Sequence, residues 1–417
     1  MSRPKTAVII GYDAISPLGS LFEDQWQRAL NGESGIGPLT RFSLSPDFPV
    51  RIAGQVPDID HEPYPFLSPR QQACWSSPIF KYAMRSVARA LEQSGLTITP
   101  DLAPRVGVTY SSAIGGLDAV LHADRRLIAE HKLPPPYANP NSCINMVGGK
   151  VAIQTGARGP ITSTISACAT GLTSVIIGAM FLAQDRADVV LCGAADFALV
   201  EPIVAGFSTM NGAYNPKTDR PEDLTPALAS RPFSVNRRGF VLSEGAGAII
   251  IATREFAESH GLDYQIELAG WGMTSDAHHI VAPNFETVRQ CMADAISDAG
   301  LTPADIAAVN AHAASTKVGD KVEFQALEAV FGRSMPPVSA NKSLIGHAMG
   351  AASAIETIFA IHGMREDLLL PTINYQADPE IRIDCLAEGK RQLQQEFVLK
   401  NSFGFGGCNA CAVFKRV

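Results

Sequence analysis

The sequence contains little that suits a protein to nucleic acids or to membranes. No run of lysine and arginine is longer than two in its 417 residues, and the formal net charge is −7. This argues against nucleic-acid binding through a basic stripe. The longest apolar stretch, roughly Gly171 to Ala183, is too short to cross a bilayer and predicts a buried core helix. The N-terminal run MSRPKTAVIIGYD lacks the apolar region of a secretion signal, so we expect a cytoplasmic protein without a membrane span.

The cysteines show neither a disulfide framework nor the spacing of metal ligands. Of the eight, only Cys408 and Cys411 lie close together, and this C-x-x-C pair lacks the second pair or the histidines of a zinc site. Several others, such as Cys192 in VVLCGAAD, lie inside apolar runs. We therefore expect reduced, buried thiols and no bound metal.

Apolar β-branched runs alternate with helical patterns along the chain, which indicates an α/β protein. The strand-like runs cover residues 6–13, 105–112, 161–166, 189–195, 247–254, 266–272, 306–314, 397–403 and 409–417. Helical patterns cover 76–95 and 284–300, and each ends near a glycine. The segment 216–238 is polar and proline-rich, and we expect it to be an ordered surface loop. Phe233 lies within this segment and Phe240 follows it, and both side chains would be costly to expose to water.

The chain also repeats its own pattern. A strand that runs into a glycine-containing turn occurs near the start, in AVIIGYDAISPLG, and again in IELAGWGMTSDAHH. Each half then contains a small-residue turn that opens a very apolar helix, SACATGLTSVIIGAM in the first and NKSLIGHAMGAASAIETIFAI in the second. We expect two similar halves, residues 1–258 and 259–417.

Cys168 stands where a β-branched run meets the first of these apolar helices. A cysteine at a helix N-terminus faces unpaired N–H groups that lower the pKa of a thiol, so Cys168 is a candidate nucleophile. The small residues around it would let a substrate approach. The alternative is an inert buried cysteine, which is the commoner role of this residue.

Two histidines and a glycine-rich loop are candidate partners for this cysteine. His312 follows a strand-like run in VNAHAAST, and His347 begins a helical pattern in NKSLIGHAMGA, five residues after Lys342. Most histidines have structural roles, but a nucleophilic cysteine needs a base or an oxyanion donor. The loop NSFGFGGCN at 401–409 lies between two strands and lacks the context of a dinucleotide fingerprint. Its glycines would let backbone N–H groups approach a ligand or let the loop hinge.

Five blocks together carry a family resemblance. They are RGP with SACATG, RPFSVNRRGFVLSEGAGA, VNAHAAST with the Asp and Glu that follow it, NKSLIGHAMGAA, and NSFGFGGCNA. In this order the chain resembles the β-ketoacyl-(acyl carrier protein) synthase II branch of the condensing enzymes, which serve fatty-acid and polyketide synthesis. The resemblance implies a thiolase fold, a duplicated five-layer αβαβα sandwich, and usually a dimer.

The resemblance also implies the chemistry. Cys168 accepts an acyl group from an acyl carrier protein, with its own N–H and that of Phe405 as the oxyanion hole. Malonyl-carrier then loses CO₂, and the enolate, held by His312 and His347, attacks the acyl thioester. Lys342 orders the second histidine. No metal or redox cofactor is implied, and phosphopantetheine belongs to the carrier protein.

The remaining matched positions support or line the implied site. Asp320 and Glu323 match acidic positions that hold the lysine and the hydrogen-bond network. The implied substrate-binding and gating residues are Thr316 beside the pantetheine arm, Phe405 as the gate of the acyl tunnel, Phe403 beside the malonyl site, and Ile114, Phe207 and Phe240 in the acyl pocket.

The chain departs from the family pattern at several positions that face the carrier or the loop. Ala314 replaces a hydroxyl that would contact pantetheine, and Cys408 stands in place of a threonine. No basic residue occurs in 71–77, and Asn211 stands where relatives often have arginine. The arginines that remain are Arg70, Arg125 and Arg126. These changes predict a specialised carrier protein and a specialised fatty-acid or type II polyketide pathway.

Four other assignments stay open at this point. A thiolase would use a second cysteine as base, for which Cys408 and Cys411 are the only candidates near the C-terminus. A chain-length factor would share the fold as a non-catalytic subunit but typically lacks the nucleophile. An acyltransferase would pass the acyl group from Cys168 to another acceptor without condensation. The chain could also be the ketosynthase subunit of a heterodimer with a chain-length factor.

Overall fold

Helices and strands alternate along the chain in the computed structural model, which describes residues 6–59, 68, 70, 74–210, 212–214 and 225–417. The strands are β1 (Ala7–Ile15), β2 (Ile36–Pro38), β3 (Ile52–Gly54), β4 (Val106–Ser111), β5 (Val189–Phe197), β6 (Glu244–Thr253), β7 (Ile266–Ser275), β8 (Ala308–Asn310), β9 (Val338–Ser339), β10 (Leu368–Leu369), β11 (Arg391–Gln392), β12 (Phe397–Gly404) and β13 (Cys408–Arg416). The α-helices are α1 (Phe22–Leu30), α3 (Pro78–Ser94), α4 (Leu117–Glu130), α5 (Ala138–Ser142), α6 (Asn145–Thr155), α7 (Thr170–Ala183), α8 (Glu201–Thr209), α9 (Arg254–Ser259), α10 (Phe285–Asp298), α11 (Lys317–Phe331), α12 (Lys342–Ile345) and α13 (Met349–Glu366). The 3₁₀ turns are η1 (Ala103–Arg105), η2 (Ala167–Ala169), η4 (Pro226–Leu228), η5 (Pro303–Asp305) and η6 (Gly332–Ser334).

One mixed sheet of nine strands runs through the molecule, in the order β4-β5-β6-β1-β7-β13-β12-β8-β9. The N-terminal and C-terminal strands meet where β1 pairs with β7. In the N-terminal half, β1 pairs antiparallel with β6, β6 antiparallel with β5, and β5 parallel with β4. In the C-terminal half, β7 pairs antiparallel with β13, β13 antiparallel with β12, and β12 parallel with β8. The two halves therefore repeat one topology, while the boundary after residue 258 stays a prediction.

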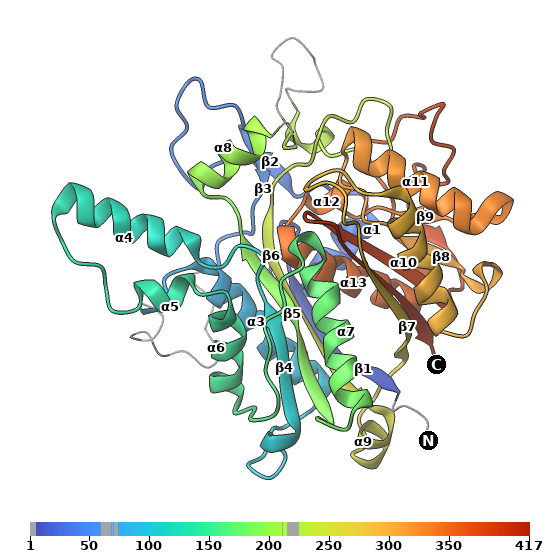
Figure 1. Ribbon diagram of the computed structural model, residues 1–417, viewed down its shortest axis with the longest axis horizontal. Coiled ribbons are helices and arrows are strands. Elements are labelled where there is room, and N and C mark those ends of the chain that lie inside the picture. Colours follow the sequence, from blue (N-terminus) through green and yellow to red (C-terminus); the bar gives the residue numbers. More distant parts are fainter. Residues whose placement is uncertain (1–5, 60–67, 69, 71–73, 211, 215–224) are drawn as a thin grey trace.

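Helices form the central layer and both outer layers. The helices α7 and α13 share the largest apolar core with strands of both halves, so they lie between them. On the outer faces, α3 and α6 pack against the N-terminal strands, and α10 and α11 pack against the C-terminal strands. Figure 1 shows α7 and α13 near the centre of the molecule and α4 standing out from its side. The N-terminal strands and the C-terminal strands of the sheet thus form two layers, with helices between them and outside each. This order of helix, sheet, helix, sheet, helix confirms the predicted thiolase sandwich.

Two sequence-based predictions of strands need correction. Of residues 161–166, only Ile161 bridges to a strand, Val108 of β4, and the rest leads into η2. Since β4 is the edge strand of the sheet, this segment has hydrogen-bond partners on one side only. The run 306–314 is a strand only over β8.

The prediction of a buried helix is confirmed, since α7 is largely buried. Phe233 and Phe240 are also buried. The ordered loop expected over 216–238 stays a prediction, because residues 216–224 lie outside the described part of the chain. Within the described ranges, no helix combines the length and the apolarity needed to cross a bilayer.

Candidate active site

Cys168 lies in the turn η2, directly before α7. The backbone of Ala167 has φ +48°, a left-handed conformation that is costly for a residue with a Cβ and persists only when the surroundings enforce it. The hydroxyl of Thr170 enforces it here, because it donates to the Ala167 carbonyl and accepts the N–H of Ser166. The turn thus fixes the thiol at the N-terminal end of the helix, beside a cavity.

A cavity of about 180 Å³ brings most of the sequence-predicted residues together. Nine of them line it: Cys168, His312, His347, Thr316, Phe403, Phe405, Ile114, Phe207 and Phe240. A wider cavity of about 560 Å³ shares Phe405, Phe240 and Thr316 with the first. It extends to Met210 and Val318, which are exposed at the surface. The cavity at the nucleophile therefore adjoins one that reaches the surface.

His347 faces the thiol directly. Its Nε2 lies 3.1 Å from the sulfur of Cys168. Its backbone is fixed just before α13, since its N–H donates to the carbonyl of Val241 and its carbonyl accepts the N–H of Ser243. The ring packs edge-on against Phe240 at 5.3 Å. His347 is therefore placed to exchange a proton with Cys168.

His312 is held through its backbone and its ring. The carboxylate of Glu323 accepts the N–H groups of His312 and Ala313 at 2.9 and 2.7 Å. The ammonium of Lys342 donates to the His312 carbonyl and lies 3.5 Å from its Nδ1. An ammonium can only donate, so Nδ1 accepts and the ring proton lies on Nε2. The two imidazole rings are 5.7 Å apart.

The partners of Lys342 differ from what the resemblance implies. Lys342 was to order the second histidine, His347, but it hydrogen-bonds to His312. Its ion pair is with Glu356 of α13, at 2.6 Å, and not with the acidic residues of α11. Sequence spacing could not reveal this pair, because Glu356 comes from a different helix.

Asp320 holds the wall of the cavity rather than the lysine. Its carboxylate accepts the N–H of Thr316 at 3.0 Å and that of Phe233 at 2.8 Å. Arg237 lies 4.0 Å away. Burial raises the pKa of Asp320 to about 7 despite these partners. Asp320 thus fixes Thr316, one of the residues that line both cavities.

Burial sets the charge state of the nucleophile and the histidines. It raises the pKa of the Cys168 thiol to about 11, although the Lys342 charge and the Phe405 N–H act against it. Burial, with the nearby Lys342 ammonium, also holds the pKa values of His312 and His347 well below 6.5. The expectation of a lowered thiol pKa is wrong for the free protein, because lost hydration outweighs the helix N-terminus. At neutral pH the site holds a neutral thiol beside neutral imidazoles.

The glycine-rich loop lies directly on the nucleophile turn. A Cβ on Gly404 would come within 2.3 Å of the Ser166 carbonyl, so only glycine fits there. This contact brings the Phe405 N–H to the sulfur of Cys168. The Phe405 and Phe207 rings both line the cavity, and their centroids are 6.3 Å apart. The loop is therefore placed both to complete an oxyanion hole and to cover the cavity.

Sequence reasoning missed the segment that holds this loop. Asp276 and His279 also line the cavity. The Gly406 N–H donates to the Ile280 carbonyl at 2.8 Å, and the Asp276 N–H donates to the Gly407 carbonyl at 3.0 Å. The DAHH run at the end of β7, polar residues directly after a strand, was the available signal.

A buried acid beneath the acyl pocket was also missed. The carboxylate of Asp196 accepts the N–H groups of Ala113, Ile114 and Ala351. Burial raises its pKa to about 6. It ties the Ile114 loop to the first turn of α13, just after His347. A charged residue inside the apolar run VVLCGAAD was its signal.

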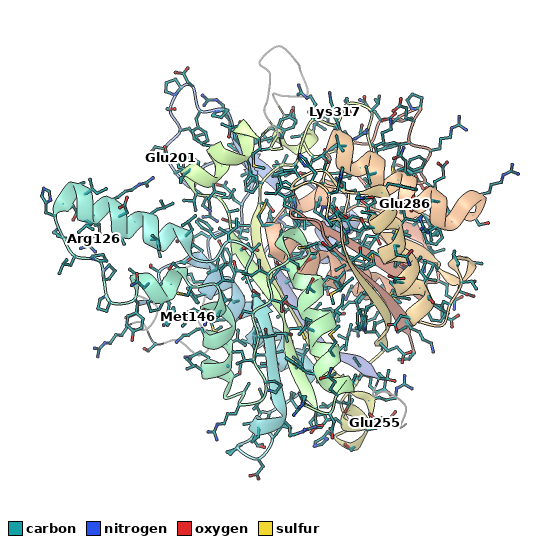
Figure 2. The ribbon with its side chains drawn as sticks, in the orientation of Figure 1. Arg126, Met146, Glu201, Glu255, Glu286 and Lys317 are labelled. Atoms are coloured by element: carbon teal, nitrogen blue, oxygen red, sulfur yellow. The ribbon has the colours of Figure 1, made fainter. Side chains whose placement is uncertain are left out.

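Two of the arginines available to a carrier already have acidic partners. Arg125 lies 3.0 Å from Glu201, and Arg126 lies 3.9 Å from Glu130. Figure 2 shows Arg126 on α4 and Glu201 at the start of α8. The sequence-based expectations of missing positive charge also concern Asn211 and residues 71–73, which lie outside the described residues.

Comparison with known proteins shows the family of the chain. The family model "Beta-ketoacyl synthase, N-terminal domain" matches residues 5–257, and "Beta-ketoacyl synthase, C-terminal domain" matches residues 266–376. The 3-oxoacyl-[acyl-carrier-protein] synthase 2 of Coxiella burnetii is 36% identical, over 99% of both chains. Two solved structures cover 100% of both chains. The ishigamide ketosynthase/chain length factor has a TM-score of 0.90 at 27% identity. A type II PKS acyl-carrier protein in complex with its ketosynthase, AntDE:AntF, has a TM-score of 0.88 at 26% identity.

Proposed function

The chain belongs to the β-ketoacyl synthase family, and we propose that it condenses malonyl-carrier with an acyl group held on Cys168. One observation carries the proposal: the Nε2 of His347 lies 3.1 Å from the Cys168 sulfur, in a cavity that His312 also lines. A condensing enzyme needs a nucleophile and two hydrogen-bond donors around one carbonyl site. The name of the Coxiella relative, 3-oxoacyl-[acyl-carrier-protein] synthase 2, supports the same reaction.

The first half-reaction loads the nucleophile. The Cys168 thiol gives its proton to Nε2 of His347, and the sulfur attacks the acyl-carrier thioester carbonyl. The N–H groups of Cys168 and Phe405 stabilise the oxyanion. The new C–S bond forms as the old one breaks, and the departing pantetheine thiolate takes the proton back from His347. The thiol pKa of about 11 makes this proton transfer necessary, because little thiolate exists at neutral pH.

The second half-reaction forms the carbon–carbon bond. The malonyl carboxylate leaves as CO₂, and the electron pair of the broken bond forms an enolate on the carrier thioester. The Nε2–H of His312 donates to its oxygen, and so does the Nε2–H of His347 once proton exchange with the solvent has moved the His347 ring to the tautomer protonated on Nε2; both imidazoles stay neutral. The enolate carbon attacks the acyl-Cys168 carbonyl and expels the Cys168 thiolate, which takes up one proton from the solvent. The product is a β-ketoacyl-carrier, and the reaction needs no cofactor of the protein's own.

The wider cavity supplies the route for the carrier's phosphopantetheine arm. It runs from the surface at Met210 and Val318 to Phe405, past Thr316. Arg238 and Lys317 lie along it, so an acidic carrier would meet positive charge at the mouth. The acyl chain would lie beyond Phe405, against Ile114, Phe207 and Phe240.

We place the enzyme in a specialised fatty-acid or type II polyketide pathway. The paired Arg125 and Arg126 leave a weaker positive field for the carrier than free arginines would. Ala314, which lines the cavity, provides no hydroxyl for pantetheine. A cytoplasmic location is part of the proposal, since all eight cysteines are free thiols.

A second subunit of the same fold would cover an exposed apolar face. Ile153 on α6 is 72% exposed, and Ile161 and Ile165, along the edge strand β4, are about half exposed. Apolar side chains beside an open sheet edge mark an interface. We expect Ile153→Glu to shift the protein toward monomers in sedimentation velocity, with Leu228→Glu, at an exposed apolar site elsewhere, as the control. An unchanged sedimentation coefficient would place the interface elsewhere. Mass spectrometry of the native assembly distinguishes a homodimer from a heterodimer.

Incubation of the enzyme with acyl-carrier and malonyl-carrier tests the proposed function. We expect a mass increase on the Cys168 peptide with acyl-carrier alone, and β-ketoacyl-carrier when both are present. Acyl-Cys168 that is never consumed by malonyl-carrier would indicate an acyltransferase without condensation. Absence of acyl-Cys168 with every carrier and chain length would indicate a non-catalytic subunit.

The Phe405 loop is expected to act as a gate. Phe405→Ala should slow condensation by roughly tenfold and weaken discrimination between acyl-carrier and malonyl-carrier, because the ring no longer separates the two cavities. Competition assays with both carriers measure the discrimination. Phe397→Ala, at the far end of the same strand, is the control. Unchanged kinetics in Phe405→Ala, together with identical loop positions in structures of free and acylated enzyme, would assign Phe405 a packing role only.

A further inference from the structure

Lys400 is a charged residue at the centre of the sheet. It lies on β12 between β13 and β8, and its side chain is completely buried. Its ammonium donates to Oε2 of Glu356 and to the carbonyl of Asn401, each at 2.8 Å. A buried ammonium is strongly unfavourable unless it is paired and hydrogen-bonded. The mechanism above gives Lys400 no role, although it lies three residues before Phe403 of the cavity wall.

Glu356 is shared between two lysines. Its Oε1 accepts from Lys342 at 2.6 Å, and its Oε2 accepts from Lys400 at 2.8 Å. One carboxylate therefore balances two ammonium groups. Because Lys400 takes part of the Glu356 charge, Lys342 keeps an excess of positive charge, and Lys342 is the lysine that contacts His312. Without Lys400, Lys342 and Glu356 would form a neutral pair.

Other titratable groups also face Lys400. Burial lowers the pKa of Lys400, and the charges of Glu356 and Glu323 act against this. The carboxylate of Glu323, on α11, accepts from the backbone of His312 and from the side chain of Asn401, and within the described residues it forms no ion pair with either lysine. Cys411 of β13 stays a neutral thiol, because burial raises its pKa well above the ordinary value. Glu356 is therefore the carboxylate that the two lysines share.

We propose that Lys400 is a positioning residue for the condensation: by sharing Glu356 with Lys342, it adds a second positive charge beneath His312 and His347. This inference rests on the proposed function for its consequence but not for its geometry. A fixed positive charge in a site of low dielectric stabilises the enolate anion when it forms. It also disfavours protonation of either imidazole, which keeps both rings neutral donors.

The sign of the effect follows from the like charges. Lys400 lowers the pKa values of both His312 and His347, as does Lys342, although burial is the largest cause. Removal of the Lys400 charge should therefore raise both pKa values. We expect a rise of roughly one unit. The acid limb of the pH profile for malonyl-carrier decarboxylation should move to higher pH by the same amount. At pH values below the shifted histidine pKa values, the variant should react roughly tenfold more slowly than the parent.

Titration of the histidine ring signals by NMR in enzyme labelled with [¹³Cε1]histidine tests this without any turnover. The signals of His312 and His347 are assigned from their loss in single variants. Three variants are compared with the parent: Lys400→Met, Lys400→Gln and the control Lys415→Met. Lys400→Gln can still donate to Glu356 but carries no charge. Lys415 lies on the neighbouring strand β13, partly exposed and paired with Glu267.

We expect both Lys400 variants to raise the two histidine pKa values and Lys415→Met to leave them unchanged. If Lys400→Gln restores the parent values, hydrogen bonding rather than charge is what Lys400 supplies, and the proposal fails. Loss of the folded state in both Lys400 variants, seen by circular dichroism, would make Lys400 a structural residue instead. A parent enzyme that forms no β-ketoacyl product would overturn the proposed function, while the titration would still decide the role of Lys400.

Discussion

Cys168→Ala should lower the formation of β-ketoacyl-carrier by at least about 10³-fold. Without Cys168, the acyl group cannot be held as a thioester until the enolate forms. No other thiol lines the cavity within the described residues, and His347 then has no sulfur to deprotonate. Mass spectrometry of the carrier products measures condensation, and release of labelled CO₂ from malonyl-carrier measures decarboxylation separately.

Cys168→Gln should separate decarboxylation from condensation. Its side-chain amide would occupy the place of the acyl thioester, while His312 and His347 remain in position as donors. Decarboxylation should therefore continue in this variant although condensation is lost. Cys192→Ala is the matched control, because Cys192 is also buried but lies on β5, outside the cavity. Condensation by Cys168→Ala at a rate near that of the parent would remove Cys168 from the mechanism.

His312→Ala and His347→Ala should differ in the step that they impair. Each removes one of the two enolate donors, so each should slow decarboxylation by roughly 10²- to 10³-fold. Only His347 contacts the sulfur, so only His347→Ala should also slow the formation of acyl-Cys168. The resemblance placed both histidines at the enolate, so they were expected to act on the malonyl half-reaction more than on acylation. The 3.1 Å contact assigns His347 a part in both steps.

Stopped reactions analysed by intact mass give the acylation rate, and CO₂ release gives the decarboxylation rate. His312→Gln and His347→Gln are the conservative variants, since each retains an N–H donor and should recover part of the decarboxylation. Since the pKa values of both histidines lie well below 6.5, decarboxylation by the parent should not depend on them above neutral pH. Equal acylation rates in the parent and His347→Ala would show that another group deprotonates Cys168.

The sequence was informative wherever function depends on local conformation. Cys168 could be recognised because a β-branched run, small residues and an apolar helix meet at it. The loop 401–409 could be recognised because Gly404, Gly406 and Gly407 permit conformations and contacts that other residues do not. The alternation of strands and helices determined the α/β class, and the repeated order of elements predicted two similar halves.

The tertiary structure decided which of these residues meet and in which charge state. Cys168 and His347 are 179 positions apart, and no spacing rule links them. Lys342 bonds to His312 and Glu356 rather than to His347 and the acids of α11, because α12, α13 and β12 come together beneath the cavity.

The thiol pKa shows the same division. The chain places Cys168 at a helix N-terminus, which by itself lowers the pKa of a thiol. The fold then buries the sulfur, and lost hydration raises the pKa to about 11. The sequence alone therefore determined the local conformation at the nucleophile turn and the glycine-rich loop, because that depends on neighbouring residues. Only the tertiary structure decided the pairings, the burial and hence the charges, because these depend on residues that the fold brings together from distant parts of the chain.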